Sequence, residues 1–281
     1  MTTLAQLQLD QTEVNCGMSY IFTLNSNHFF IIDGGYFSAG EDERLYRWLC
    51  SRCDGKPEIN GWFFSHAHQD HIGVFINMMK HHRRDLVIRQ LIFNFQPLKL
   101  PETGEGWDIK SNDPATVRKF YEILDAYCQD IPVTTPKTGD LIKIEELDIH
   151  VLYTHEDLPC PSTFNDHSTV IRVDTCGQRI LFPGDVYEKG SDVLLRDPAQ
   201  IKSDIVQVSH HGFNGAAKAF YEAVNAEVAL WPTPDYCIPM LRDREPNRYL
   251  LDESEVKEHI FSGYGTRELV LPYSPFISEH C

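Results

Sequence analysis

The sequence lacks any segment of the kind that sends a chain into a membrane or out of the cell. Residues 1–6 show no basic region followed by an apolar run, and no stretch approaches the ~20 apolar residues of a membrane helix. The 8 cysteines are scattered over 281 residues, which favours reduced thiols over a disulfide framework. We therefore expect a cytoplasmic protein that has no membrane partner.

Basic residues are also scarce. The chain has 25 Lys and Arg against 41 Asp and Glu, which gives a formal net charge of −16. Such a charge repels the phosphates of a nucleic acid over most of the surface. Nucleic acid is therefore not an expected partner, and a small-molecule substrate is.

No Gly/Ser-rich or Pro-rich linker, repeat or low-complexity block divides the chain, and 42% of its residues are hydrophobic. This composition is enough for one sizeable core. We predict a single domain over residues 1–281, with an insertion near 96–130 and an irregular tail from about residue 232. The sequence does not indicate an oligomeric state.

Short apolar strands alternate with helical segments along the chain. Apolar runs at 18–24 and 28–33 flank the turn residues Asn25-Ser26-Asn27, which predicts a hairpin. Further strands are expected at 4–9, 59–65, 86–95, 141–145, 148–153, 168–174, 178–182, 204–209 and 227–231, the last taken as the final inner strand. Helices are expected at 41–51, from about 72 to 83, at 114–129 and at 215–225, and a loop at 96–112. The order predicts an α/β fold with two sheets packed face to face and helices outside, a four-layer αββα sandwich.

Metal-binding chemistry is indicated by the segment Ser65-His66-Ala67-His68-Gln69-Asp70-His71-Ile72-Gly73, which follows an apolar strand. His66 and His68 are two residues apart, so an extended backbone turns both rings to one side. Asp70 and His71 follow as the chain turns into a helix. Imidazole and carboxylate ligands suit zinc, with Mn²⁺ or iron as the alternatives, and fewer than four protein ligands leave a position for water.

This segment resembles the HxHxDH motif of the metallo-β-lactamase superfamily at every motif position. Further matches follow in order along the chain: Asp33-Gly34-Gly35, Phe182-Pro183-Gly184-Asp185 and Val208-Ser209-His210-His211-Gly212. The resemblance implies the αββα fold and a hydrolase with two divalent ions, which activate water between them. It also implies that Asp33 buttresses the metal loop.

The resemblance assigns ligands to each ion. His66 and His68 would hold the first ion, Asp70, His71 and His211 the second, and Asp185 would span both. His211 is favoured as the late ligand because it directly precedes glycine. His210 is the alternative ligand, or a catalytic group that contacts substrate, and Asp70 is expected to orient water or receive its proton. A third protein ligand for the first ion is either His167 or replaced by water.

A narrower likeness lies in Asn165-Asp166-His167-Ser168-Thr169-Val170, which is similar to the metallo-β-lactamase domain of the DNA-uptake protein ComEC and to phosphorylcholine esterases. The ComEC-type domain usually has Asp where His68 stands here. This branch implies a phosphoester or phosphodiester substrate, which is anionic, and the acidic composition favours a small one. The competing hypotheses are a hydrolase of a thioester, lactone or β-lactam, an iron redox enzyme of the same fold, and a non-catalytic metal-binding module.

Overall fold

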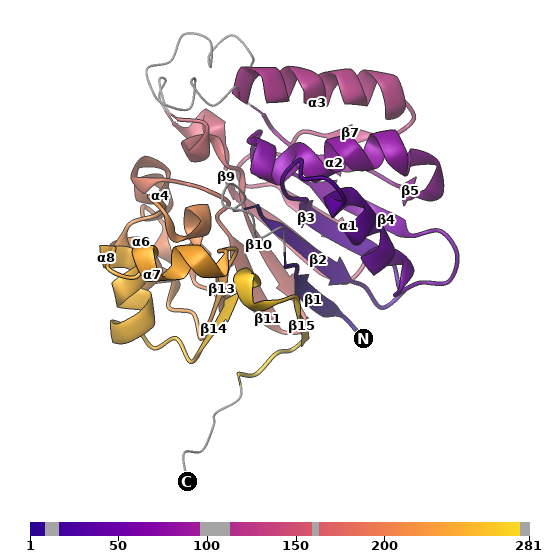
Figure 1. The fold of residues 1–281 in the computed structure, drawn as a ribbon. Coiled ribbons are helices and arrows are strands. Elements are labelled where there is room, and N and C mark those ends of the chain that lie inside the picture. Colours follow the sequence, from indigo (N-terminus) through magenta and orange to yellow (C-terminus); the bar gives the residue numbers. More distant parts are fainter. Residues whose placement is uncertain (9–16, 96–112, 159–162, 276–281) are drawn as a thin grey trace.

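The computed structural model describes residues 1–8, 17–95, 113–158 and 163–275, and shows two sheets stacked between two groups of helices (Figure 1). Within these residues the first sheet has eight strands. In spatial order they are β15 (Arg267–Val270), β1 (Thr3–Gln6), β2 (Ser19–Thr23), β3 (Phe29–Asp33), β4 (Glu58–Phe63), β6 (Leu91–Ile92) and β7 (Val133–Thr134), while β5 (Val87–Ile88) also pairs with β4.

The second sheet has seven strands among the described residues. Their order is β14 (Glu258–Phe261), β13 (Val228–Trp231), β12 (Ile205–Gln207), β11 (Gln178–Phe182), β10 (Val170–Thr175), β9 (Leu147–Tyr153) and β8 (Leu141–Ile144). The helices on the first sheet are α1 (Glu41–Cys50), α2 (Gln69–His81) and α3 (Asp113–Tyr127). Those on the second are α4 (Glu188–Leu194), α5 (Pro198–Ile201), α6 (Lys218–Val224), α7 (Ile238–Leu241) and α8 (Glu245–Arg248).

Side-chain alternation explains the four layers. In β3, Phe29 and Ile31 face the helices α1 and α2, whereas Phe30 and Ile32 face the second sheet. All of these side chains are fully buried, which explains why residues 29–32 are all apolar. The predicted αββα sandwich is confirmed.

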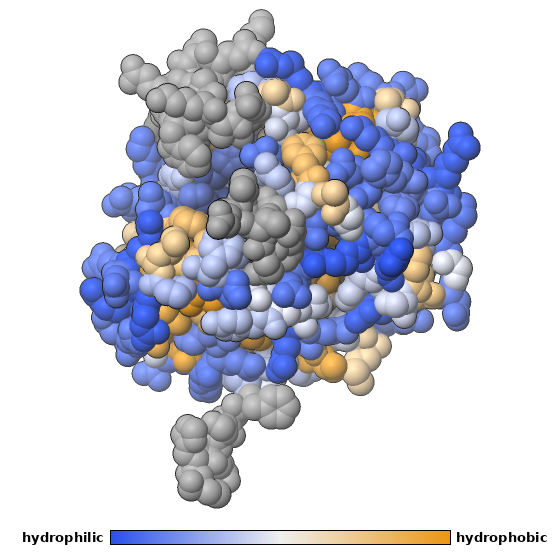
Figure 2. Space-filling view, viewed as in Figure 1, coloured by the Kyte–Doolittle hydropathy of each residue, from blue (hydrophilic) through white to orange (hydrophobic). Residues whose placement is uncertain are grey.

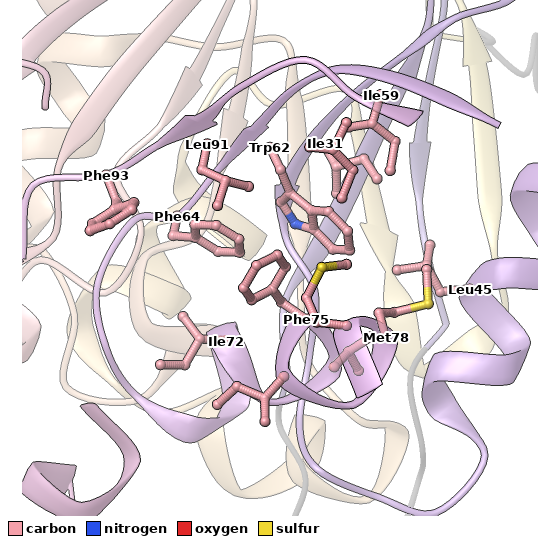
Figure 3. Close-up of a cluster of buried hydrophobic side chains, with 14 of the residues drawn as sticks. Ile31, Leu45, Ile59, Trp62, Phe64, Ile72, Phe75, Met78, Leu91 and Phe93 are labelled. Atoms are coloured by element: carbon pink, nitrogen blue, oxygen red, sulfur yellow. The ribbon is translucent and has the colours of Figure 1, made fainter. Parts of the chain in front are cut away.

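The core between the first sheet and its helices combines aliphatic side chains with a group of contacting aromatic rings (Figure 3). The ring of Phe75 on α2 lies 5.1 Å from that of Trp62 and 4.8 Å from that of Phe64. Helix α2 also packs closely on the loop after β3: a Cβ at Gly73 would lie 2.6 Å from the Phe37 nitrogen, so only glycine fits there. This core fixes the start of α2, where Asp70 and His71 lie, against the first sheet.

The hairpin predicted around residues 25–27 is present, because β2 and β3 pair antiparallel with Ile21 opposite Ile31. Helix α2 begins at Gln69, earlier than the predicted position near 72, so Asp70 and His71 lie in its first turn. The strand predicted over 86–95 is two short pieces, β5 and β6. The predicted loop at 96–112 lies outside the described residues.

The expectation of an irregular tail from about residue 232 is wrong. Strand β14 adds parallel to β13, and β15 adds antiparallel to β1 near the N-terminus. Residues 227–231 therefore form an inner strand but not the last one. Both late strands are short and mostly half-buried or exposed, so they lack the apolar run that signals an inner strand.

The surface is largely polar. The face in Figure 2 is mostly hydrophilic, with apolar residues in small separate groups. The described cysteines are free thiols. Of the helices in the described residues, none combines the length and the apolar character that a bilayer crossing requires.

Candidate metal centre

The candidate site lies where three inner strands end. Strand β4 leads into the loop with His66 and His68, and this loop leads into α2 with Asp70 and His71. Strand β11 is followed by Asp185, and β12 is followed by His211. The site is therefore built from loops and a helix start that both sheets hold in place.

Two groups of ligand atoms form there, and they share one carboxylate. His66, His68 and Asp185 form the first group, and in each group all the ligand atoms lie within 4.8 Å of one another. The second group contains Asp70, His71, Asp185 and His211. The structure thus brings together all six side chains that were predicted as ligands. They fall into the two predicted groups, with Asp185 in both.

In the first group the Nε2 of His66 lies 3.0 Å from the Nδ1 of His68 and 3.7 Å from the Oδ2 of Asp185. The ring of Phe164 stacks on the ring of His68 at 5.5 Å between centroids. The first group is therefore covered by an aromatic ring on the side of His68.

In the second group the Oδ2 of Asp185 lies 3.1 Å from the Nε2 of His71 and 3.4 Å from the Nε2 of His211. Asp70 is the most exposed member, with 23% of its side chain accessible, while His71 and His211 are 0% and 2% accessible. An incoming molecule would therefore meet the second group at Asp70.

Asp33 orients His71, as the resemblance implied. The Oδ2 of Asp33 lies 2.7 Å from the Nδ1 of His71, and the same carboxylate accepts hydrogen bonds from the Ser65 backbone nitrogen and hydroxyl at 2.8 and 2.7 Å. With its Nδ1–H donated to Asp33, His71 presents a lone pair on Nε2 to the site. Asp33 thus fixes the tautomer and the direction of a ligand ring.

The adjacent residues His210 and His211 separate because both have left-handed backbone angles, with φ of 48° and 54°. His211 donates its Nδ1–H to the carbonyl of Pro232 at 2.8 Å and turns Nε2 toward Asp185. His210 lies outside both groups, with its ring 5.0 Å from that of Tyr187. Of the two alternatives, His211 is the one with ligand geometry. Two consecutive strained residues are a feature of functional sites.

Opposite charges in the cluster stabilise one another. Burial alone would lower the pKa of His71, but Asp185 and Asp33 raise it well above its ordinary value. Burial also opposes protonation of His211, yet Asp185 raises the pKa of that ring to about 9. Burial would raise the pKa of Asp185, but His71 and His211 hold it well below its usual range. Protons on His71 and His211 thus offset part of the negative charge of the carboxylates. Metal ions that bind these two rings would displace the protons.

The residues present fit divalent ions. Oδ1 of Asp185 is buried and accepts no hydrogen bond from any described residue. Such an oxygen costs free energy unless a donor or a cation satisfies it. Four imidazoles and two carboxylates are a ligand set that zinc, manganese and iron accept.

His167 and His155 do not enter either group. His167 is buried, and its ring lies 5.7 Å from that of His155, whose Nε2 is 3.1 Å from the Oδ1 of Asn94. His167 is thus in neither ligand group, and its role as a third ligand to the first ion stays a prediction. Among the described residues, the first group contains three ligand residues and the second contains four.

Two residues that the sequence analysis did not predict contact the candidate ligands or the loops that carry them. The hydroxyl of Ser65 lies between Asp33, His66 and His71, at 2.7, 3.1 and 3.3 Å from their nearest polar atoms. Its place directly before the histidine motif was the only signal available. The carboxylate of Asp166 also contacts the loop after Asp185, and that contact was not predicted.

The fold and the cluster together define an αββα protein with two adjoining groups of side chains, at the ends of its inner strands, that could hold metal ions. The family model of the metallo-beta-lactamase superfamily matches residues 16–223. The chain belongs to this superfamily, whose members are mostly hydrolases.

One curated relative is ComE operon protein 3 of Bacillus subtilis (strain 168). It is 26% identical over 195 residues, which covers 69% of this chain and 22% of the relative. The chain thus spans about a fifth of the length of that protein. The match agrees with the likeness seen in the segment Asn165–Val170.

Solved structures show the same fold at low identity. CmlA, a diiron beta-hydroxylase from Streptomyces venezuelae, aligns with a TM-score of 0.59 and 12% identity over 96% of this chain and 54% of its own. The metallo-beta-lactamase fold protein YhfI from Bacillus subtilis aligns with a TM-score of 0.56 and 12% identity over 95% of this chain and 100% of its own. Zn(2+)-bound PqqB from Methylobacterium extorquens gives a TM-score of 0.54 and 8% identity, over 96% and 100% of the two chains. These likenesses establish the fold.

Proposed function

We propose that the protein is a metal-dependent hydrolase with two divalent ions, zinc in the first instance, that acts on a small phosphoester or phosphodiester. The observation that carries this proposal is the pair of ligand groups joined by Asp185. Two ions held in this way would lower the pKa of a water molecule toward 7 and act as Lewis acids on the bond that is broken. His66 and His68 would hold one ion, and Asp70, His71 and His211 the other.

The chain's own groups have distinct tasks. Asp70 is the most exposed member of the cluster, with 23% of its side chain accessible, so we assign its carboxylate to orienting the attacking water or receiving its proton. His210 stands beside the cluster, and its buried Nδ1 has no partner among the described residues. We assign this ring to a hydrogen bond with the substrate. Burial of the remaining ligands excludes bulk water from the reacting centre.

Two observations support an anionic substrate. The first is the likeness of Asn165–Val170 to the phosphoester-handling branch of the superfamily. The second is Arg244, whose guanidinium lies 6.0 Å from the centre of the Phe213 ring and also donates a hydrogen bond to Asn214. The Phe213 ring in turn lies 5.9 Å from that of His210, so one aromatic ring separates this cation from His210. A guanidinium matches the geometry of a phosphate group.

The test is turnover of bis-p-nitrophenyl phosphate, a thioester and nitrocefin by the purified chain, before and after chelation and after zinc, manganese or iron is added back. We expect phosphodiester turnover that chelation abolishes and metal restores. His211→Ala should lose it, whereas His150→Ala should not, because His150 lies on β9 beside Asp174 and outside the site. Metal-dependent turnover of the thioester or nitrocefin alone would overturn the phosphoester assignment. Bound metal without any turnover would instead favour a binding module.

A further inference from the structure

The segment Phe164–Thr169 lies between the two loops that carry the candidate ligands, and we call it the clamp segment. It contains the Asn-Asp-x-Ser pattern singled out in the sequence, a short 3-10 turn (Asn165–His167) and the start of the run into β10. From Asn165 to Thr169 every residue is at most 4% exposed. None of these residues is a member of the ligand groups.

On one side the clamp segment binds the loop of Asp185. The hydroxyl of Ser168 accepts a hydrogen bond from the backbone nitrogen of Asp185 itself, at 3.0 Å. The Oδ1 of Asp166 accepts two more, from the backbone nitrogens of Tyr187 and Gly190, both at 3.0 Å. Two side chains thus hold three backbone nitrogens, two in the Asp185 loop and one in the helix α4 that follows it.

On the other side the clamp segment binds the loop of the histidines. The backbone nitrogen of Thr169 donates to the carbonyl of Ser65 at 2.8 Å, and the Phe164 ring stacks on His68. Gly184 lies between the two loops with a φ of +59°, and a Cβ there would lie 2.9 Å from the Ser168 hydroxyl and 3.1 Å from the Cβ of Ser65. The two ligand loops therefore meet through this segment at van der Waals distance.

The choice of a carboxylate for this task has an energetic reason. Asp166 is 2% exposed, and burying a carboxylate without hydrogen bonds is costly. Hydrogen bonds to a charged acceptor are shorter and stronger than those between neutral groups. Asp166 thus holds its two backbone donors more firmly than a neutral acceptor would, and a rigid loop is what a shared ligand requires.

We infer that Asp166 and Ser168 are positioning residues that set the place of Asp185 relative to His66 and His68, and so determine how tightly the site holds its metal ions. This inference rests on the proposed metal centre and deepens it. The two side chains act through backbone nitrogens of the Asp185 loop, not by touching an ion or the substrate.

The test compares zinc affinity with stability in four variants of the full chain. Asp166→Ala removes both hydrogen bonds to the loop, Asp166→Asn keeps one carbonyl oxygen, and Ser168→Ala removes the bond to Asp185. Asp204→Ala is the matched control, because the Oδ2 of Asp204 accepts a backbone hydrogen bond from Arg179 at 2.7 Å, at the opposite end of β11. Zinc affinity is measured by competition with a chelating dye, and the melting temperature is measured on the metal-free chain.

We expect Asp166→Ala to weaken zinc binding about 10- to 100-fold, the range typical when a group that orients ligands is removed. Asp166→Asn should recover part of that loss, and Ser168→Ala should also weaken binding. Asp204→Ala should lower the melting temperature but leave the zinc affinity unchanged. If Asp166→Ala does not fold, Asp166→Asn and Ser168→Ala still give the comparison with the control.

The inference is overturned if folded Asp166→Ala and Ser168→Ala bind zinc as tightly as the wild type. It is equally overturned if Asp204→Ala loses as much zinc affinity as they do for the same drop in melting temperature, since the effect would then be one of stability alone. A wild-type chain that binds no zinc, manganese or iron would defeat the proposed function itself, which is a different result.

Discussion

The hydrogen bond between Asp33 and His71 allows a quantitative prediction. Both side chains are 0% exposed, and their nearest polar atoms are 2.7 Å apart. In Asp33→Asn, the amide oxygen can still accept the hydrogen bond from the Ser65 nitrogen, which turns the NH₂ group toward the Nδ1 of His71. His71 must then accept at Nδ1 and carry its proton on Nε2, so it loses the lone pair that faces Asp185.

The magnitude follows from the role of the lost contact. Removing the group that orients a metal-ligating histidine costs about 10- to 100-fold in affinity, or roughly 1.4–2.7 kcal/mol. We expect the upper end of this range, because both side chains are fully buried. The assay is a zinc titration of the metal-free variant against a chelating dye, with the two binding steps fitted separately. The step assigned to His71 should weaken, and the other should change less.

Asp42→Asn is the matched control. Asp42 is 5% exposed and its Oδ2 lies 2.6 Å from the Nδ1 of His81, whose side chain is 60% exposed, so α1 and α2 carry an Asp–His hydrogen bond away from the site. Its zinc affinity should equal that of the wild type. The reasoning is refuted if folded Asp33→Asn binds both ions normally, or if Asp42→Asn loses as much affinity.

Two further predictions concern stability and substrate binding. Burial lowers the pKa of His259 to about 4, and its Nδ1 accepts a hydrogen bond from the Trp231 indole at 3.1 Å. The unfolded chain, with a histidine pKa of ~6.5, then binds the extra proton, so this stability is present above about pH 6.5 and lost as pH falls toward 4. Urea unfolding across that range should show a weaker pH dependence in His259→Asn, by about 1–2 kcal/mol after allowing for partial exposure of the ring; an unchanged dependence would contradict this. Steady-state kinetics of Arg244→Gln should show a higher KM for an anionic substrate and little change in kcat. The control Arg248→Gln removes an exposed ion pair with Glu253 and should leave both constants unchanged. Equal effects of the two variants would contradict the role assigned to Arg244.

The sequence predicts the inner layers of the fold well, because strands that are buried on both faces consist of apolar residues. In β3 the run Phe29–Ile32 is apolar on both faces, and both faces are covered. The late strand β14 has Glu258 and His259 beside a single buried residue, Ile260, so its pattern resembles that of a loop. Its place depends on pairing with β13, which a local pattern does not contain.

The candidate ligands were predictable because a metal site requires particular side chains at close spacing. Their supports were harder to foresee, since Asp166 acts on the backbone nitrogens of Tyr187 and Gly190, which carry no residue-specific signal. The choice between His210 and His211 required the left-handed backbone at both residues. Spacing alone also kept open His167, which the fold places beside His155.

Counting the metal ions bound to each chain tests the central claim most directly, because Asp185 is the one side chain that belongs to both ligand groups. Elemental analysis of the purified wild-type chain should find two divalent ions per molecule. The same measurement on folded Asp185→Ala should find both sites depleted, whereas His66→Ala should empty mainly one. A wild-type chain without metal, or an Asp185→Ala chain that keeps two ions, would contradict the account.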